Sequence, residues 1–363
     1  MPLDKIKKIR THSSEVFIGE DVFNVLNEYL RLYKDSKIFV LVDENTLEHC
    51  VTTLITQNKI LHNAEIIEFD SGEENKTLEV CYQLWKTLAD YKADRKSLLI
   101  NLGGGVITDM GGFIASTYKR GIDFINVPTT LLSQIDASVG GKTGVDFEGL
   151  KNVIGVFNEP KGVFIYPEFL TTLDKRQMLS GYAEALKHAL IKDADYWIEL
   201  KDGMLSDSEN WTSLITQSVT IKNDIVLKDP LEKNERKLLN FGHTIGHAIE
   251  SFSLENDQNP ICHGEAIAVG MFCEAFISNK SNKMTKTDLE DISSTIKSFY
   301  KFYELDEAHF HSYIELMKHD KKNEGDEINF TLLSKIGKAD FNKEIGVDLI
   351  LDSLSYYNKV NKT

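Results

Sequence analysis

The sequence lacks several features that mark well-known classes of protein. Its four cysteines, Cys50, Cys81, Cys262 and Cys273, form no C-x-x-C pair and have no spacing typical of a zinc knuckle. We therefore expect reduced, buried thiols, as in proteins of a reducing cytoplasm. No apolar run approaches the ~20 residues of a membrane-spanning helix, and residues 1–20 contain no apolar stretch typical of a signal peptide. These absences predict a cytoplasmic protein without a membrane partner.

Positive charge is scarce as well. Lys and Arg number 41 against 56 Asp and Glu, which gives a formal net charge of -15. Binding to the phosphate backbone of a nucleic acid needs a basic surface, so we expect no nucleic-acid partner. Net charge does not exclude a local cluster of cations that binds a small anion.

The pattern of the chain changes near residue 170. Before this point, segments typical of buried strands end in polar or Gly-rich loops and alternate with a helical pattern at 77–91; these segments are 37–46, 64–76, 97–105, 121–130 and 162–170. This alternation predicts βαβ units and a parallel sheet, with ligands at the carboxyl ends of the strands. The later segments all have helical periodicity: 180–200, 211–229, 235–252, 263–280 and 287–303. We predict an α/β domain over 1–170 and an all-α domain over 171–363.

Two Gly-rich segments have the composition of an anion-binding turn. "LGGGVITDMGGF" (102–113) follows a strand and opens a helix, but its spacing is not G-x-G-x-x-G. It fits either a backbone that approaches a pyrophosphate or a tight turn that packs a helix onto a strand. "SVGGKTG" (138–144) is not a P-loop, because Asp136 stands where that motif needs Gly.

"LLNFGHTIGHAIESF" (238–252) carries two histidines four residues apart, which a helix places on one face. The segment is not H-E-x-x-H, because no Glu follows His243, and this disfavours a metalloprotease. "GYAEALKHAL" (181–190) adds Glu184, and "CHGEAIAVG" (262–270) adds His263. Together they form either a His/His/carboxylate metal site with an open position or ordinary helix-surface pairs and packed rings.

Several basic residues flank these segments. They are either solvated surface or part of an anion-binding site, and they comprise Lys142, Lys151, Lys187, Lys222, Arg236 and the lysines of 319–323. A metal accompanied by several cations favours a phosphorylated and carboxylated small-molecule substrate.

Ten short segments follow one another in a characteristic order: "VDENT", "GEENK", "NLGGGVITDMGGFIAS", "YKRGI", "VPTTLLSQIDASVGGKTGVDF", "LKNVIGVF", "LSGYAEALKHALI", "RKLLNFGHTIGHAIE", "HGEAIAVGM" and "DKKN". In this order they resemble the 3-dehydroquinate synthase family of the sugar-phosphate cyclase superfamily. The resemblance implies a Rossmann-like NAD-binding domain, an all-α metal-binding domain and a homodimer.

The resemblance also implies roles for individual residues. The ligands of a divalent metal, zinc or cobalt, would be Glu184, His243 and His263. The contacts to NAD would be Asp43, Asn45, Glu73, Lys76, Gly104, Gly105, Val106, Asp109, Thr129, Thr130, Leu132, Lys142, Lys151, Phe169, Leu170, Thr171 and Thr172. The substrate contacts would be Asp136, Lys142, Asn152, Lys187, Lys222, Arg236, Asn240, His247 and Lys322, with Lys321 as the alternative to the last. Arg120 would reach the site of the partner subunit.

The implied reaction converts 3-deoxy-D-arabino-heptulosonate 7-phosphate to 3-dehydroquinate and phosphate, in the shikimate pathway to chorismate and the aromatic amino acids. NAD would act catalytically and return to its starting state. Two alternatives stay open at this point. One is a cyclase for a sugar phosphate without a carboxylate, and the other is a metal- and NAD-dependent polyol or glycerol phosphate dehydrogenase.

Overall fold

The computed structural model describes residues 6–148, 150–203, 210–319 and 328–362. The chain forms two compact units. Unit 1 comprises Met1–Asp174 and Ser208–Asn223, and unit 2 comprises Lys175–Asp207 and Asp224–Thr363. No helix among the described residues is long and apolar enough to cross a membrane.

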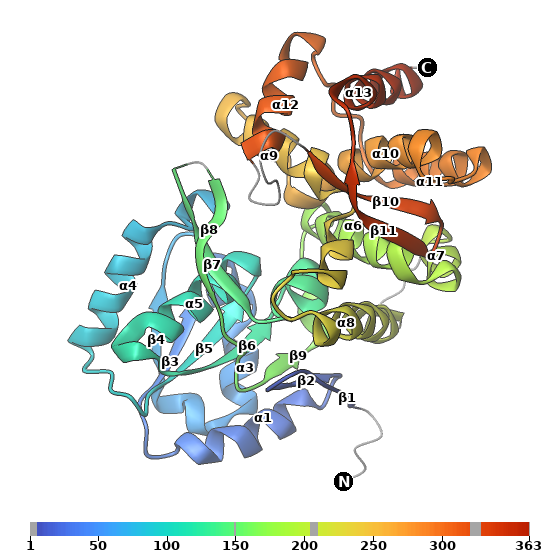
Figure 1. Ribbon diagram of the computed structural model, residues 1–363. Coiled ribbons are helices and arrows are strands. Elements are labelled where there is room, and N and C mark those ends of the chain that lie inside the picture. The colour runs from blue at the N-terminus through green and yellow to red at the C-terminus, as the bar shows by residue number, and fades with distance from the viewer. Residues whose placement is uncertain (1–5, 149, 204–209, 320–327, 363) are drawn as a thin grey trace. The chain divides into compact units, whose positions relative to one another are not determined.

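Unit 1 is built on a seven-stranded sheet of order β1-β2-β9-β6-β5-β3-β4 (Figure 1). Its strands are β1 Lys7–Arg10, β2 Glu15–Ile18, β3 Ile38–Val42, β4 Glu65–Glu68, β5 Leu98–Gly103, β6 Asp123–Pro128 and β9 Val163–Ile165. Every neighbouring pair is parallel except β1 with β2. The predicted parallel α/β sheet is therefore confirmed.

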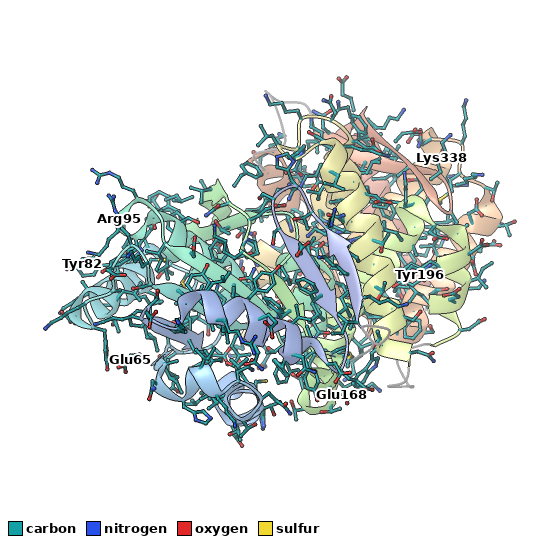
Figure 2. All side chains as sticks on the ribbon, turned by 90° about the horizontal axis from the view of Figure 1, so that it is seen from below. Glu65, Tyr82, Arg95, Glu168, Tyr196 and Lys338 are labelled. Carbon is teal, nitrogen blue, oxygen red and sulfur yellow. The ribbon has the colours of Figure 1, made fainter. Side chains whose placement is uncertain are left out.

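Helices cover both faces of this sheet, which explains why its strands are continuously apolar. Successive side chains of β3 alternate between two hydrophobic cores: Val40 packs with α1 (Val22–Leu30) and α3 (Val51–Gln57), whereas Leu41 packs with α4 (Leu78–Asp90) and α5 (Gly105–Thr117). Helix α4 has one buried and one exposed face, because Leu84 is buried and Tyr82 lies on its outer surface (Figure 2).

A second, two-stranded sheet in unit 1 was not predicted. It consists of β7 (Lys142–Phe147) and β8 (Leu150–Phe157), which pair antiparallel. Strand β7 lies along α5, where Thr143 packs so close to Gly112 that a Cβ there would meet its Cγ2 at 2.4 Å. The hairpin thus extends the α5 side of unit 1.

Unit 2 is mostly helical, in the region where an all-α domain was predicted. Its elements include α6 Lys175–Lys192, α7 Ala194–Lys201, η10 Glu235–Asn240, α9 His243–Asn256, α10 His263–Ser281, α11 Lys286–Phe299, α12 Phe310–His319 and α13 Val347–Asn361. Helix α10 is buried along most of its length and contacts α6, α9, α11 and α13. Helix α8 (Trp211–Lys228) belongs to unit 1 up to Asn223.

The structure corrects two details of the predicted helical region. The first is an antiparallel hairpin of β10 (Asn329–Lys335) and β11 (Lys338–Glu344), so the region is not entirely α-helical. The second concerns 235–252, which was predicted as one helix. It divides into η10 and α9 because Gly242 adopts a left-handed conformation with φ +80°, which an L side chain rarely adopts. The break makes His243 the first residue of α9.

Candidate functional site

Several predicted cofactor residues of unit 1 lie at the carboxyl ends of its parallel strands. From β3 the chain moves outward to β4, and from β5 it moves the opposite way to β6 and β9. The ends of β3 and β5 therefore flank the point where strand order reverses, the usual ligand position in such sheets. Asp43 caps α2 (Glu44–His49) directly after β3, and Gly104 caps α5 directly after β5. Thr129 and Thr130 follow β6.

The Gly-rich turn after β5 serves both packing and access. A Cβ on Gly103 would lie 2.1 Å from Ile107 Cδ1, so Gly103 is required for close packing of α5 on its strand. A Cβ on Gly105 would lie 3.5 Å from Ala137 Cβ, an ordinary contact. A methyl group would therefore fit at Gly105, and the N–H groups at the start of α5 favour an anion.

A buried ion cluster lies beside this turn. The Lys76 ammonium donates to Asp109 Oδ2 and to Asn152 Oδ1, both at 2.7 Å. Glu73 Oε1 lies 3.8 Å from the same nitrogen and 3.2 Å from Lys151 Nζ. Burial disfavours the charge of Lys76, but Asp109, Glu73 and another carboxylate outweigh it and raise the pKa of Lys76. The structure thus brings four predicted cofactor contacts and Asn152 together.

Other predicted residues of unit 1 have different surroundings. Lys222 Nζ lies 2.8 Å from Asp136 Oδ1, so these two predicted substrate contacts are paired. Lys142 begins β7 and is exposed. Phe169 and Leu170 are buried, and Phe169 belongs to a hydrophobic core. The remaining predicted cofactor contacts lie near the ends of the strands. Asn45 is on α2, Val106 is on α5 and Leu132 precedes a short π-helix, Ser133–Ala137. Thr171 and Thr172 end η7 (Pro167–Thr172), the short 3-10 helix after β9.

In unit 2 the structure places one carboxylate and three imidazoles side by side. Glu184 Oε1 lies 3.4 Å from His243 Nε2 and 3.4 Å from His263 Nε2. The other carboxylate oxygen of Glu184 pairs with Lys187 Nζ on the next turn of α6. Glu184 is fully buried and Lys187 is 2% exposed. The two oxygens of Glu184 therefore face different partners.

His247 completes this cluster from the next turn of α9. Its ring centroid lies 4.9 Å from that of His243 and 5.8 Å from that of His263. One ring nitrogen each of His243, His247 and His263 lie within 4.8 Å of one another. The predicted shared face of His243 and His247 is confirmed.

Backbone and side-chain acceptors orient two of these rings. Phe241 O lies 3.1 Å from His243 Nδ1, and Glu250 Oε2 lies 3.0 Å from His263 Nδ1. Burial disfavours protonation of His263, but Glu250 and Glu184 outweigh it and raise the pKa of His263 to about 9. The surroundings of the ring therefore favour positive charge at this position.

The donor set fits a divalent transition metal. Two ligand atoms each about 2.1 Å from a tetrahedral ion are roughly 3.4 Å apart, and this matches both distances from Glu184 Oε1 to the imidazole Nε2 atoms, 3.4 and 3.4 Å. In each ring a hydrogen-bond acceptor contacts Nδ1, which leaves the lone pair of Nε2 to bind an ion. Two imidazoles and a carboxylate are typical zinc ligands and also suit cobalt.

The other predicted substrate residues of unit 2 lie on or near η10. Arg236 is buried, and its Nη1 donates to Pro230 O at 2.6 Å. Asn240 Nδ2 donates to Glu232 Oε1 at 3.0 Å. Lys322 and the alternative Lys321 lie outside the described residues.

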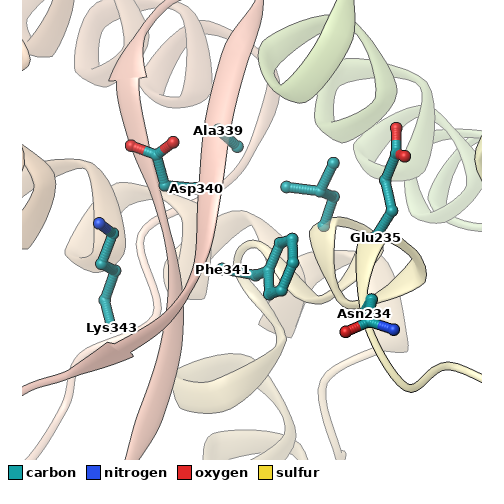
Figure 3. Close-up of a pocket in the computed structure, with 7 residues that line it drawn as sticks. Asn234, Glu235, Ala339, Asp340, Phe341 and Lys343 are labelled. Carbon is teal, nitrogen blue, oxygen red and sulfur yellow. The ribbon is translucent and has the colours of Figure 1, made fainter.

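A surface hollow of about 500 Å³ lies between η10 and β11. Figure 3 shows Phe341 projecting from β11 toward the segment that carries Asn234 and Glu235. The hollow contains none of the predicted site residues; its lining is Asn234, Glu235, Leu238, Ala339, Asp340, Phe341 and Lys343.

Sequence reasoning missed two buried acidic residues next to the cluster. Glu250 contacts His263, and Glu274 accepts from Gly242 N at 2.6 Å and from Ile245 N at 3.2 Å. Glu274 carried a usable signal, because it is a charged residue inside the apolar run "AVGMFCEAFI" (268–277).

Comparisons with known proteins identify the family of the chain. Residues 66–180 match the model of the 3-dehydroquinate synthase N-terminal domain, and 181–323 match that of the C-terminal domain. The 3-dehydroquinate synthase of Parabacteroides distasonis is 43% identical, covering 95% of this chain and 98% of that protein.

Two solved structures have a similar fold. One is 2-deoxy-scyllo-inosose synthase complexed with carbaglucose-6-phosphate, NAD+ and Co2+, with a TM-score of 0.85, 26% identity and coverage of 96% of this chain and 99% of that one. The other is 2-epi-5-epi-valiolone synthase from Streptomyces hygroscopicus subsp. jinggangensis with NAD+ and Zn2+ bound, with a TM-score of 0.85, 23% identity and coverage of 98% and 99%. With both domain models matched and a 43% identical relative covered almost end to end, the chain belongs to the 3-dehydroquinate synthase family.

Proposed function

We propose that this protein converts 3-deoxy-D-arabino-heptulosonate 7-phosphate to 3-dehydroquinate and phosphate, as a phosphorus–oxygen lyase of aromatic amino acid biosynthesis. The observation that carries the proposal is the cluster of Glu184, His243 and His263, in which both distances from Glu184 Oε1 to an imidazole Nε2 match those between ligands of a tetrahedral ion. Near-full-length similarity to 3-dehydroquinate synthases supports the substrate.

The proposed cofactors are NAD and one divalent ion, zinc or cobalt. Structurally similar cyclases hold NAD+ with Co2+ or Zn2+. When bound, NAD supplies a reversible hydride acceptor and the ion supplies Lewis acidity. The α/β region, residues 1–170, would hold NAD through the residues at the ends of β3, β5 and β6. The helical region, 171–363, would hold the ion through Glu184, His243 and His263.

Other predicted site residues would position the substrate and move protons. His247 shares the face of His243, and we assign it proton transfer or hydrogen bonding to the substrate instead of metal binding. Lys187 pairs with Glu184, so it neutralises the buried carboxylate and can donate to a substrate oxygen. Arg236 with Asn240, and the paired Asp136 and Lys222, would hold the carboxylate and hydroxyl groups.

Phosphate binding is assigned to Lys142, Asn152 and Lys322. The Asn152 side chain supports this assignment, because its carbonyl oxygen accepts from Lys76. The amide group is thereby oriented with its NH2 end, which can donate to a phosphate oxygen, away from Lys76.

Two alternative activities are less well supported. The first is a polyol dehydrogenase. A probable glycerol dehydrogenase from Sinorhizobium meliloti has a similar fold, with a TM-score of 0.62, but its sequence is only 13% identical to this chain. Arg236 is buried and lies close in sequence to the proposed ligand His243. We assign it to the substrate carboxylate, and a cyclase whose substrate lacks a carboxylate would leave it without that role. The relatives at 43% and 37% identity are both 3-dehydroquinate synthases.

We also propose that the protein is a cytoplasmic homodimer. Arg120 is exposed at the end of η5 (Tyr118–Arg120) with φ +70°. Within the described part of the chain its side chain forms no ion pair or hydrogen bond. This leaves the guanidinium available to the partner subunit.

The reaction is tested with purified protein, the heptulosonate phosphate, NAD and added zinc or cobalt. We expect phosphate release without net NADH accumulation, and we expect a chelator to stop it. Steady accumulation of NADH would instead identify a dehydrogenase. No phosphate release from metal-replete protein saturated with NAD would refute the proposal.

A further inference from the structure

The two helices that begin with a proposed metal ligand, α9 and α10, pack antiparallel and unusually close. A Cβ on Gly270 would lie 1.9 Å from Gly242 O, and a Cβ on Gly246 would lie 3.0 Å from Ala266 O. Further along α9, Glu250 contacts His263 at the start of α10. Successive contacts therefore run forward along α9 and backward along α10, which makes the two helices antiparallel. The first residue of each helix lies beside the middle of the other.

Each helix sends a buried carboxylate to the start of the other. Glu250 on α9 is 3% exposed, and its Oε2 lies 3.0 Å from His263 Nδ1. Glu274 on α10 is fully buried and accepts from Gly242 N at 2.6 Å and Ile245 N at 3.2 Å, on either side of His243. The two contacts are reciprocal: one holds an imidazole directly, and the other holds the backbone that carries an imidazole.

The contact with Glu250 decides which ring nitrogen of His263 faces the metal position. An ionised carboxylate can only accept, so the proton of a neutral ring lies on Nδ1. Nε2 is then the nitrogen with a lone pair, and it is the atom 3.4 Å from Glu184 Oε1. A carboxylate on the far nitrogen also raises the basicity of a ligating imidazole.

The contact with Glu274 fixes His243 in a different way. The first N–H groups of a helix have no partner within the helix, and here a buried carboxylate accepts two of them across the left-handed Gly242. This holds the first turn of α9 against α10. The His243 ring, at position one of that turn, therefore has little freedom to move away from Glu184.

We propose that Glu250 and Glu274 are positioning residues for the metal centre, holding His263 and His243 with their Nε2 atoms directed at the ion. The proposal rests on the proposed metal-dependent function and extends it to residues that do not touch the ion. The observations behind it are the reciprocal contacts between α9 and α10, which are separate from the choice of Glu184, His243 and His263 as ligands.

The test measures binding of cobalt(II) and zinc(II) to full-length, metal-free protein by competition with a chromogenic chelator. The variants are Glu250→Ala, Glu250→Gln and Glu274→Gln. Glu255→Gln is the matched control, because Glu255 is exposed on the same helix. The visible absorption spectrum of the cobalt form reports ligand geometry, and the melting curve of the metal-free form reports folding.

We expect Glu250→Ala to lower the affinity for both ions by about 10- to 100-fold, the usual effect of removing the hydrogen-bond partner of a metal-binding histidine. Glu250→Gln should recover part of the loss, because its amide oxygen can still accept from Nδ1. Glu274→Gln should weaken binding and alter the cobalt spectrum, since an amide can accept one of the two N–H groups but not both equally. The control should match the wild type.

Wild-type affinity and an unchanged cobalt spectrum in both Gln variants would overturn the proposal, and these variants preserve side-chain volume if Glu250→Ala does not fold. The same conclusion follows if Glu255→Gln weakens binding as much as Glu250→Gln. If the wild type itself binds neither ion, the proposed metal-dependent function fails, and the positioning role fails with it.

Discussion

Glu184 and the surrounding imidazoles show how one buried carboxylate can serve two purposes. Its Oε1 is equally distant from two Nε2 atoms, while its other oxygen pairs with Lys187. A buried carboxylate requires compensation by cations or hydrogen bonds. Lys187 supplies part of that compensation, and a divalent ion held by Glu184, His243 and His263 would supply the rest.

Metal retention and turnover should separate between His247 and the proposed ligands. We expect Glu184→Ala and His263→Ala to lose the metal, because each removes one of three protein ligands. His247→Ala should retain it and lower turnover by roughly 10²- to 10⁴-fold, the range for loss of a general acid or base. Metal content after gel filtration and the rate of phosphate release measure the two effects.

The exposed His311 on α12 provides the control for this prediction. His311→Ala should leave both quantities unchanged. Loss of metal from His247→Ala would contradict the assignment. It would favour a three-histidine site, which is also compatible with ring nitrogens that lie within 4.8 Å of one another.

Thiol reactivity should distinguish Cys262 from the other cysteines. The four cysteines form no disulfide; Cys50, Cys81 and Cys273 are buried, whereas Cys262 is partly exposed, contrary to the expectation of four buried thiols. Burial raises the pKa of Cys50 and of Cys81 to about 12 and raises that of Cys273 as well. The reactive thiolate is therefore nearly absent from these three at pH 8.

We expect a disulfide reagent at pH 8 to label one thiol per native chain, and all four after unfolding. Cys262→Ser should remove the native reaction. Because the raised pKa values keep the buried groups protonated, raising the pH from 7 to 9 should not add a second fast thiol. Two or more fast thiols in the native protein would show that a buried cysteine is accessible.

At the scale of elements, the close contact of α9 with α10 predicts strong sensitivity at Gly270. In Gly270→Ala the new Cβ would lie 1.9 Å from Gly242 O and 2.8 Å from Gly246 N, so the helices must separate. We expect the free energy of unfolding to fall by about 1–3 kcal/mol or more, and cobalt binding to weaken with it. Urea denaturation of the metal-free protein and chelator competition measure these changes.

Gly346→Ala is the matched control for this substitution. Gly346 has φ -68°, and a Cβ there would meet no atom within 4 Å. Gly346 is the N-cap residue of α13 and makes no side-chain cap hydrogen bond, so Ala there should cost at most about 1 kcal/mol, the usual effect of a poorer cap. Equal stability of the two variants would mean that α9 and α10 can separate without cost.

The sequence predicted those elements whose local pattern matches their surroundings. β3 is recognisable because all five of its residues, Ile38–Val42, are buried between two layers of helices. β11 (Lys338–Glu344) is not, because it contains "KADFNKE" and its side chains are mostly exposed or half-buried. The break at Gly242 was also missed, since a glycine inside a helical pattern does not reveal a positive φ.

Within the candidate site the same distinction holds. Family motifs indicated Glu184, His243 and His263, which the fold brings together although the first and the last are 79 positions apart in the sequence. Glu250 is part of a quoted motif, yet its partner could not be inferred, because the contact depends on the antiparallel register of α9 and α10. Register between helices is a property of tertiary packing.

At the scale of the whole molecule, the proposed homodimer predicts complementation between two inactive variants. Arg120→Ala lacks the group proposed to reach the partner's site, and Glu184→Ala lacks a proposed metal ligand in its own site. A mixed dimer contains one subunit with Glu184 intact, and its partner supplies Arg120. That site should be active, while the other site of the same dimer lacks both groups.

Random mixing makes half of the dimers mixed, and each has one of two sites intact. Refolding the two variants together at equal amounts should therefore restore about a quarter of wild-type phosphate release. Light scattering should give about twice the chain mass of 41.2 kDa in every sample. Variants mixed without refolding control for slow exchange of subunits. Dimers that form but regain no activity would place Arg120 in its own subunit's site, and a monomeric mass would remove the proposed partner altogether.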